Sequence, residues 1–168
     1  MIKFKINTQK AIETVLWIIH RGETNVYNIM KILFDAEQYH LNKYGRPITG
    51  DKYIAMEYGT VPSWIYDSTK LRRPGLGFVR TENTLSADRC SDLNYLSESD
   101  IEALEHGFKN YAGKSFSEVV EKNHSEPAWK KAWENRGDSD AVDIDFRDMI
   151  KEPWLAKDLE LLASNMVL

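Results

Sequence analysis

Two Glu-x-x-His pairs are the residues whose types and spacing could perform chemistry in this sequence. Glu37 precedes His40 by three residues, and Glu121 stands in the same relation to His124. On a helix this spacing puts both side chains on one face, as in half of a carboxylate-bridged di-iron site. The other half needs one more glutamate from each of two further helices, and the sequence identifies neither. We therefore expect no metal and no cofactor. The favoured interpretation is a histidine at the core edge bonded to a backbone carbonyl, with the glutamate solvated beside it.

An enzymatic alternative stays open around the same histidine. If the chain after residue 50 folds over the helix, Glu37, His40, Asp51 and Tyr53 would bring together an acid, a base and a phenol, with His124 as a further candidate. Nucleophile motifs such as G-x-S-x-G and a phosphate-binding loop are absent. We therefore assign no catalytic residues and predict that the protein is not an enzyme.

The acidic stretch from residue 138 to residue 148 could suggest a calcium loop. An EF-hand needs a glycine at its sixth position and a glutamate at its twelfth, and counting from Asp138 these positions hold Asp143 and Met149. We expect a solvated acidic loop instead.

Composition bounds the remaining possibilities. The 168 residues include 22 Lys and Arg against 26 Asp and Glu, and this net charge of −4 argues against a nucleic-acid partner. Cys90 is the single cysteine, so neither an intramolecular disulfide nor a cysteine metal cluster is possible. We expect one domain over residues 1–168, with no membrane association. The first residues lack the apolar segment of a signal peptide, which predicts a cytoplasmic protein.

Apolar periodicity and capping residues predict the elements that position these side chains. We expect a first helix capped by Asn7 or Thr8. Further helices should begin at Thr24 or Asn25, at Pro62, after Ser97, after Ser115 and at Pro127, with helical turns in 146–150 and 154–167. The second helix should end at Tyr44, because Gly45 suits the position after a helix and Pro47 follows. Two hairpins are predicted, within 48–58 and 78–86. The expected fold class is mainly α (α+β), a compact helical domain with one or two small β-hairpins.

The segment from His40 to Asp67 is unusually rich in rings. It holds four tyrosines and a tryptophan among three glycines and two prolines. Such rings combine a large apolar area with a polar tip, and they are favoured at protein interfaces. The alternative is that they fill a small core and brace a bend.

The stretch LFDAEQYHLNKYGRPITGDKYIAMEYGTVPSWIYD closely resembles the signature of the Panacea domain, the SocA-like antitoxin family that also includes phage-associated GepA-type proteins. The matching positions are His40, Tyr44, Gly45, Pro47, Ile48, Gly50, Asp51, Tyr53, Ala55, Gly59, Val61 and Pro62. A later His-x-x-x-x-Trp element matches His124 and Trp129, whereas Thr60 replaces the usual proline.

The resemblance implies a small cytoplasmic protein that is encoded beside a toxin, often in a prophage, and that neutralises this cognate toxin by direct binding. One alternative role within the family is an adaptor that delivers the toxin to a AAA+ protease. The family assigns no catalytic residues. Because related scaffolds serve toxins of unrelated chemistry, the signature residues are expected to hold the scaffold, and a direct role in binding stays open.

A third function, transcriptional regulation through a helix-turn-helix, is allowed by the first two helices and the small basic patch of Arg72, Arg73 and Arg80. The net acidity and the lack of a basic recognition helix argue against it.

Overall fold

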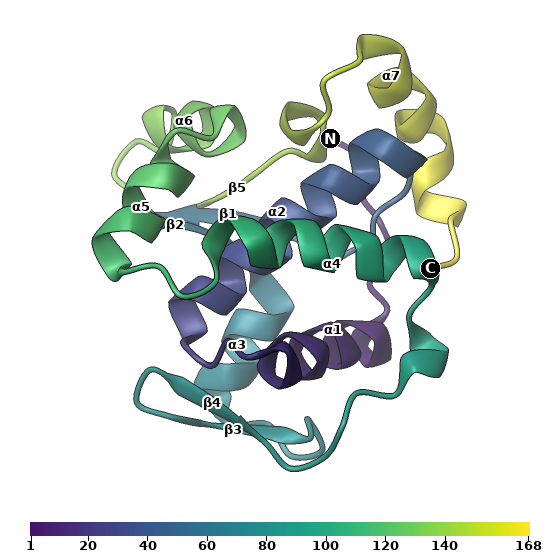
Figure 1. Cartoon of the computed structure of the whole chain (residues 1–168). Helices are drawn as coiled ribbons and strands as arrows, with labels where there is room; N and C mark the ends of the chain where they lie inside the picture. Colours follow the sequence, from purple (N-terminus) through teal and green to yellow (C-terminus); the bar gives the residue numbers. More distant parts are fainter.

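Local capping signals determine where most of the helices begin. The computed structural model describes residues 1–168, which form seven α-helices, three 3-10 turns and two small antiparallel sheets (Figure 1). In chain order the elements are α1 (Thr8–Arg21), α2 (Val26–Tyr44), β1 (Tyr53–Met56), β2 (Gly59–Pro62), α3 (Ser63–Leu71), β3 (Phe78–Thr81), β4 (Thr84–Ala87), η1 (Leu93–Tyr95), α4 (Glu98–Tyr111), α5 (Phe116–His124), α6 (Pro127–Glu134), β5 (Ala141–Asp143), η2 (Phe146–Met149), α7 (Pro153–Leu162) and η3 (Ala163–Asn165). This mainly helical α+β architecture confirms the predicted fold class.

The predicted caps of the first, second, fourth and fifth helices are present. Asn7 and Asn25 accept hydrogen bonds from backbone N–H groups in the first turns of α1 and α2. Ser97 forms a complete capping box with Asp100 at the start of α4, and Ser115 accepts from the Glu118 N–H at the start of α5. Gly45 adopts a left-handed conformation with φ of 69° after the last turn of α2, as predicted.

Helix α2 is the central element, with α1, α4, α5 and β2 packed around it (Figure 1). Its buried apolar residues occupy all sides rather than one stripe, which is the pattern of a helix inside a core. Helix α4 lies directly against the backbone of α2 at Gly107, where an added Cβ would lie 2.4 Å from the carbonyl oxygen of Ile32. The absence of a side chain at Gly107 therefore sets the distance between these two helices.

Strand β1 forms a hairpin with β2, pairing Tyr53 with Pro62 and Met56 with Gly59. The hairpin predicted within 48–58 is therefore present, but its second strand lies at 59–62. Tyr53 and Ala55 point into the core, and the residues that alternate with them are partly exposed. The second predicted hairpin is also present, as β3 and β4, and it lies against α1.

The acidic stretch was predicted as a solvated loop, and this prediction was wrong for part of it. Residues 141–143 form β5, which pairs with the free edge of β1 and makes a sheet of order β2-β1-β5. Asp145 then caps η2 by accepting from the Arg147 N–H, and Asp148 pairs with Lys131 at 2.6 Å. A three-residue edge strand with two exposed residues leaves no apolar pattern from which it could be predicted.

One smaller boundary also differs from expectation. Pro62 was placed at the start of a helix, but it ends β2 and stands at the position before α3. None of the helices has the length and apolar character that crossing a membrane requires.

Candidate functional site

His40 is fully buried near the end of α2, and both of its ring nitrogens have partners. Nδ1 lies 2.7 Å from the Arg46 carbonyl oxygen, and Nε2 lies 2.9 Å from the Ser99 hydroxyl. A carbonyl can only accept, so the neutral ring carries its proton on Nδ1 and accepts from Ser99 through Nε2. Burial lowers the pKa of His40 below its usual value, which favours this neutral form. The ring therefore ties the chain after α2 to the start of α4.

Asp100 links the same region to α1 through a buried ion pair. Its Oδ2 lies 2.9 Å from the ammonium of Lys10, and both side chains are almost completely buried. The same oxygen accepts from the Ser97 N–H at 2.8 Å, and Oδ1 lies 3.4 Å from His40 Nε2. One carboxylate thus holds α1, α2 and α4 together at a single point.

Glu37 is buried with 1% of its surface exposed, so the expectation that it is solvated was wrong. Its carboxylate accepts hydrogen bonds from the N–H groups of Ile48 at 2.8 Å and Gly50 at 3.1 Å, and from the Thr49 hydroxyl at 3.3 Å. The loop between α2 and β1 is buried without a strand partner here, and Glu37 supplies the acceptors that its backbone needs. Burial raises the pKa of Glu37 to about 7.

This raised pKa predicts a pH-dependent contribution of Glu37 to stability. The folded-state pKa of about 7 lies above the ordinary value of 4.5, so the contribution is fully present below pH 4.5 and is lost as the pH rises through 7. The stability of the unmodified protein relative to Glu37→Gln is therefore expected to fall by about 3 kcal/mol between pH 4.5 and 8, as measured by urea unfolding.

The matched control is Glu121→Gln, which changes the exposed glutamate of the other Glu-x-x-His pair. Its stability relative to the unmodified protein should not change over this pH range. If the stability difference between the unmodified protein and Glu37→Gln is equally independent of pH, the raised pKa assigned to Glu37 is contradicted.

The side chain of Asp51 caps α3, although Asp51 does not adjoin this helix in the sequence. Pro62 precedes the helix and offers no side-chain cap. Asp51 instead accepts from the Trp64 N–H at 2.9 Å and from the Ile65 N–H at 3.1 Å. The position suits a carboxylate because the helix N-terminus carries partial positive charge, although burial raises the pKa of Asp51 to about 6.

We call the segment from His40 to Asp67 the bend, and its rings and glycines make close contacts inside the fold. Tyr53 donates from its hydroxyl to the Leu33 carbonyl at 3.0 Å, whereas Tyr44 is 42% exposed and donates to Glu102. Gly50 and Gly59 have positive φ angles of 75° and 115°, and an added Cβ at either would approach neighbouring atoms to less than 3 Å. Pro47 is buried in the loop that Glu37 supports.

His124 and Trp129 clamp the turn between β1 and β2. The two rings stack at 3.9 Å. His124 Nε2 lies 2.7 Å from the Glu57 carbonyl oxygen, and Trp129 donates to the Met56 carbonyl at 2.9 Å. Trp129 therefore packs against the histidine ring while both contact the turn.

The groups named in the enzymatic alternative do not share a cavity. None of Glu37, His40, Asp51 and Tyr53 lines any of the five principal cavities of the molecule. Their polar atoms bond to backbone groups and to the hydroxyls of Thr49 and Ser99 instead. No group of three or more His, Cys, Asp or Glu side chains is arranged to hold a metal ion.

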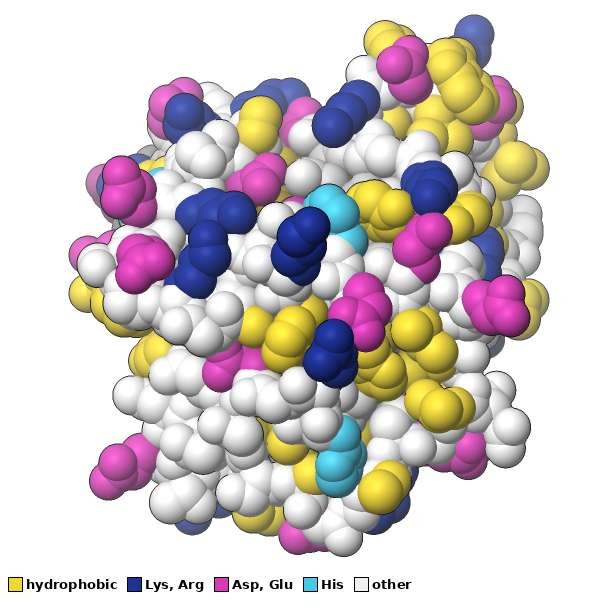
Figure 2. All heavy atoms as spheres, in the orientation of Figure 1, with side chains coloured by type: hydrophobic (Ala, Val, Ile, Leu, Met, Phe, Trp, Pro, Cys, Tyr) yellow, Lys and Arg dark blue, Asp and Glu magenta, His cyan; other side chains and the backbone are white.

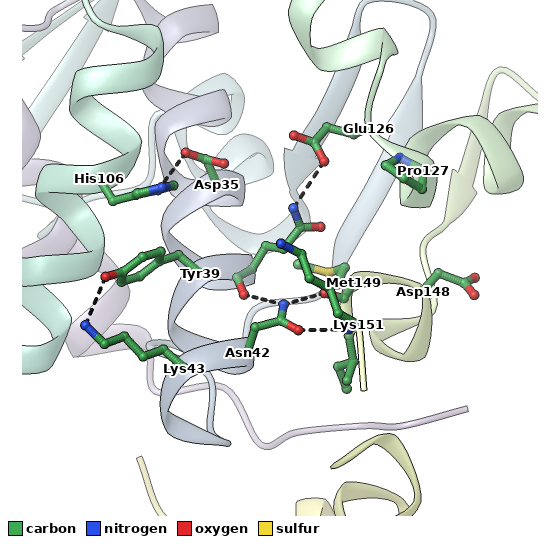
Figure 3. A pocket seen from close by; sticks show the side chains of 12 residues that line it. Asp35, Tyr39, Asn42, Lys43, His106, Glu126, Pro127, Asp148, Met149 and Lys151 are labelled. Atoms are coloured by element: carbon green, nitrogen blue, oxygen red, sulfur yellow. Dashed lines mark hydrogen bonds and ion pairs between the residues drawn. The ribbon is translucent and has the colours of Figure 1, made fainter. Parts of the chain in front are cut away.

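A polar groove of about 790 Å³ lies along the second half of α2. It is bordered by α4, by the junction of α5 with α6, and by the segment that includes η2 (Figure 3). The lining residues are Asp35, Gln38, Tyr39, Asn42, Lys43, His106, Glu126, Pro127, Asp148, Met149, Ile150 and Lys151. No sequence pattern indicates this groove, because its walls come from four separate segments.

Many of the polar groups in the groove already bond to each other (Figure 3). Asp35 lies 3.1 Å from His106, and Gln38 donates to Glu126 at 3.1 Å. Asn42 donates to the Met149 carbonyl and accepts from the Lys151 N–H. These pairs fix the walls and leave few free polar atoms for a ligand.

Three large apolar side chains of α7 are exposed. Trp154 is 63% exposed, Leu161 is 73% exposed and Leu162 is 58% exposed. Leu155 and Leu159 of the same helix are buried against the core. Figure 2 shows hydrophobic side chains gathered at the upper right, over α7. We call Trp154, Leu161 and Leu162 the α7 face.

Comparison with known proteins gives one match. The family model described as "Antitoxin SocA-like, Panacea domain" matches residues 29–130, more than half of the chain. The matched span begins in the first turn of α2 and ends within α6, so it contains the entire bend and excludes α7. No curated protein and no solved structure matches the chain.

Proposed function

The chain belongs to the antitoxin SocA-like Panacea domain family, and from this membership we propose that it neutralises a cognate protein toxin by binding it directly. The observation that carries the proposal is the family match over residues 29–130. The family supports an antitoxin-like and non-enzymatic role in general. The specific toxin-binding mode is our inference.

The contacts of the signature residues favour a scaffolding role for them. His40, Asp51 and Tyr53 are buried and bonded within the fold, so they present no surface to a partner. Tyr44 is the exposed exception. The binding surface is therefore best sought outside the buried bend.

We place the toxin contact on the α7 face. Large exposed apolar side chains gathered on one element are typical of protein-binding surfaces. Trp154 adds a rigid ring of the type that often dominates binding energy. Helix α7 also lies outside the matched span, where a scaffold that serves different toxins can vary without disturbing its core.

Co-expression with the product of the adjacent gene tests both parts of the proposal. The unmodified chain should restore growth to a host that expresses the toxin, whereas the double variant Trp154→Ala, Leu161→Ser should fail. Removing a buried aromatic anchor and a leucine from an interface typically costs several kcal/mol, which is on the order of a hundredfold or more in affinity.

The control is Leu71→Ser at the end of α3, where the leucine is 68% exposed, close to the 73% of Leu161. This variant should rescue growth fully. Rescue by the α7 variant would place the contact elsewhere, and failure of the unmodified chain to rescue or to form a complex would refute the antitoxin function.

The same cultures separate direct neutralisation from protease delivery. Under direct binding, immunoblots should show an unchanged amount of toxin when the chain is present. A fall in toxin that depends on a host AAA+ protease would show the adaptor role instead.

A further inference from the structure

A second cavity, of about 660 Å³, lies under the turn between β1 and β2. Its walls come from the first turns of α2, from α3 and from the end of α6. Four aromatic side chains, Tyr27, Tyr58, Tyr66 and Trp133, line it. Its volume falls in the range of small-molecule sites, which are lined mainly by apolar rings and a few placed polar groups.

Lys31 forms part of the lining of this cavity and is almost completely buried. Its ammonium donates one hydrogen bond, to the Thr60 carbonyl at 2.9 Å, and it takes part in no ion pair. An ammonium has three donors, so two remain without a protein partner. Gly59 allows this arrangement, because an added Cβ there would lie 2.8 Å from Lys31 Cε.

Burying the Lys31 ammonium lowers the stability of the fold, so its presence here requires another explanation. Burial lowers the pKa of Lys31 to about 7, and no neighbouring charge contributes to the shift. A methionine would fill the same space without a group that must be desolvated. Residues that reduce stability in this way are characteristic of binding sites.

The charges at the mouth of the cavity restrict what can enter. Glu57 in the turn and Asp140 before β5 are exposed acids, and Arg136 stacks on Trp133 at 4.0 Å. The two acids disfavour a multiply charged anion such as a phosphate dianion. The single buried ammonium suits one negative charge, and the rings suit a flat apolar group beside it.

We propose that this cavity binds a small aromatic monocarboxylate, with its carboxylate on Lys31 Nζ and its ring among the aromatic side chains. Carboxylate binding supplies the counter-charge that Lys31 lacks. The lysine then takes up a proton when the ligand binds at pH values above 7. This activity is separate from toxin binding and is measured on the protein alone.

Calorimetric titrations at pH 7.5 test the proposal with indole-3-acetate, 4-hydroxyphenylacetate and benzoate as probes. At least one should bind, with proton uptake revealed by buffers of different ionisation enthalpy. The neutral amide of that probe should bind at least tenfold more weakly, because it cannot provide the counter-charge.

Lys31→Met should reduce carboxylate binding at least tenfold while raising the temperature of unfolding. The matched control Lys52→Met removes an exposed lysine and should leave binding unchanged. The proposal is overturned if none of the three acids binds, if acid and amide bind equally, or if Lys31→Met retains the affinity.

Discussion

Replacing Asp100 by alanine is expected to destabilise the protein by about 3–5 kcal/mol, because the Lys10 ammonium is then buried without its counter-charge. The two side chains lie 2.9 Å apart and are 7% and 0% exposed. The substitution also removes the capping box of α4 and the carboxylate beside His40. Urea unfolding followed by circular dichroism at pH 7 measures the loss.

Glu118→Ala is the matched control for this substitution. Glu118 occupies the same position relative to Ser115 that Asp100 occupies relative to Ser97, but it is exposed and has no buried partner. Its removal should cost less than about 1 kcal/mol. Adding Lys10→Met to Asp100→Ala should recover part of the lost stability, since it removes the orphaned charge. Equal effects of Asp100→Ala and Glu118→Ala would contradict the role assigned to the ion pair.

Gly107→Ala is expected to destabilise the protein by about 2–4 kcal/mol, although alanine is favoured over glycine in a helix by about 1 kcal/mol. The added Cβ would lie 2.4 Å from the Ile32 carbonyl oxygen and 3.2 Å from the Ala36 nitrogen. Both are backbone atoms of α2 and cannot rotate away, so α4 must shift as a whole.

Lys109→Ala provides the comparison on the same helix, because Lys109 is exposed. The free energy of unfolding of this variant should stay within about 0.5 kcal/mol of that of the unmodified protein. If Gly107→Ala proves neutral or stabilising in the same unfolding assay, then helix propensity outweighs the contact and α4 does not set its distance from α2 at this glycine.

Much of the fold could be predicted because its signals are local. Asn7, Asn25, Ser97 and Ser115 cap helices through side chains that lie within three residues of their partners. Gly45 ends α2 by the same kind of local rule. Strand β5 could not be predicted, since its pairing with β1 depends on a segment about 90 residues away and its three residues carry no pattern.

The buried polar residues were harder to predict, because segments distant in the sequence form their surroundings. Glu37 was expected in solvent, since nothing in the sequence shows that the loop at residues 48–50 turns back over it. No motif in the sequence marks Lys31 as a buried residue. One indication was available: apolar residues on every side of α2, from Val26 to Ala36, imply that any charged residue among them is buried.

The most direct test of the antitoxin function is to mix the purified chain with the purified product of the adjacent gene and measure mass by size-exclusion chromatography with light scattering. We predict a single complex of defined stoichiometry that the Trp154→Ala, Leu161→Ser variant does not form and the Leu71→Ser variant does. Elution of the two unmodified proteins at their separate masses, together with undiminished toxin activity in the mixture, would contradict the proposed function.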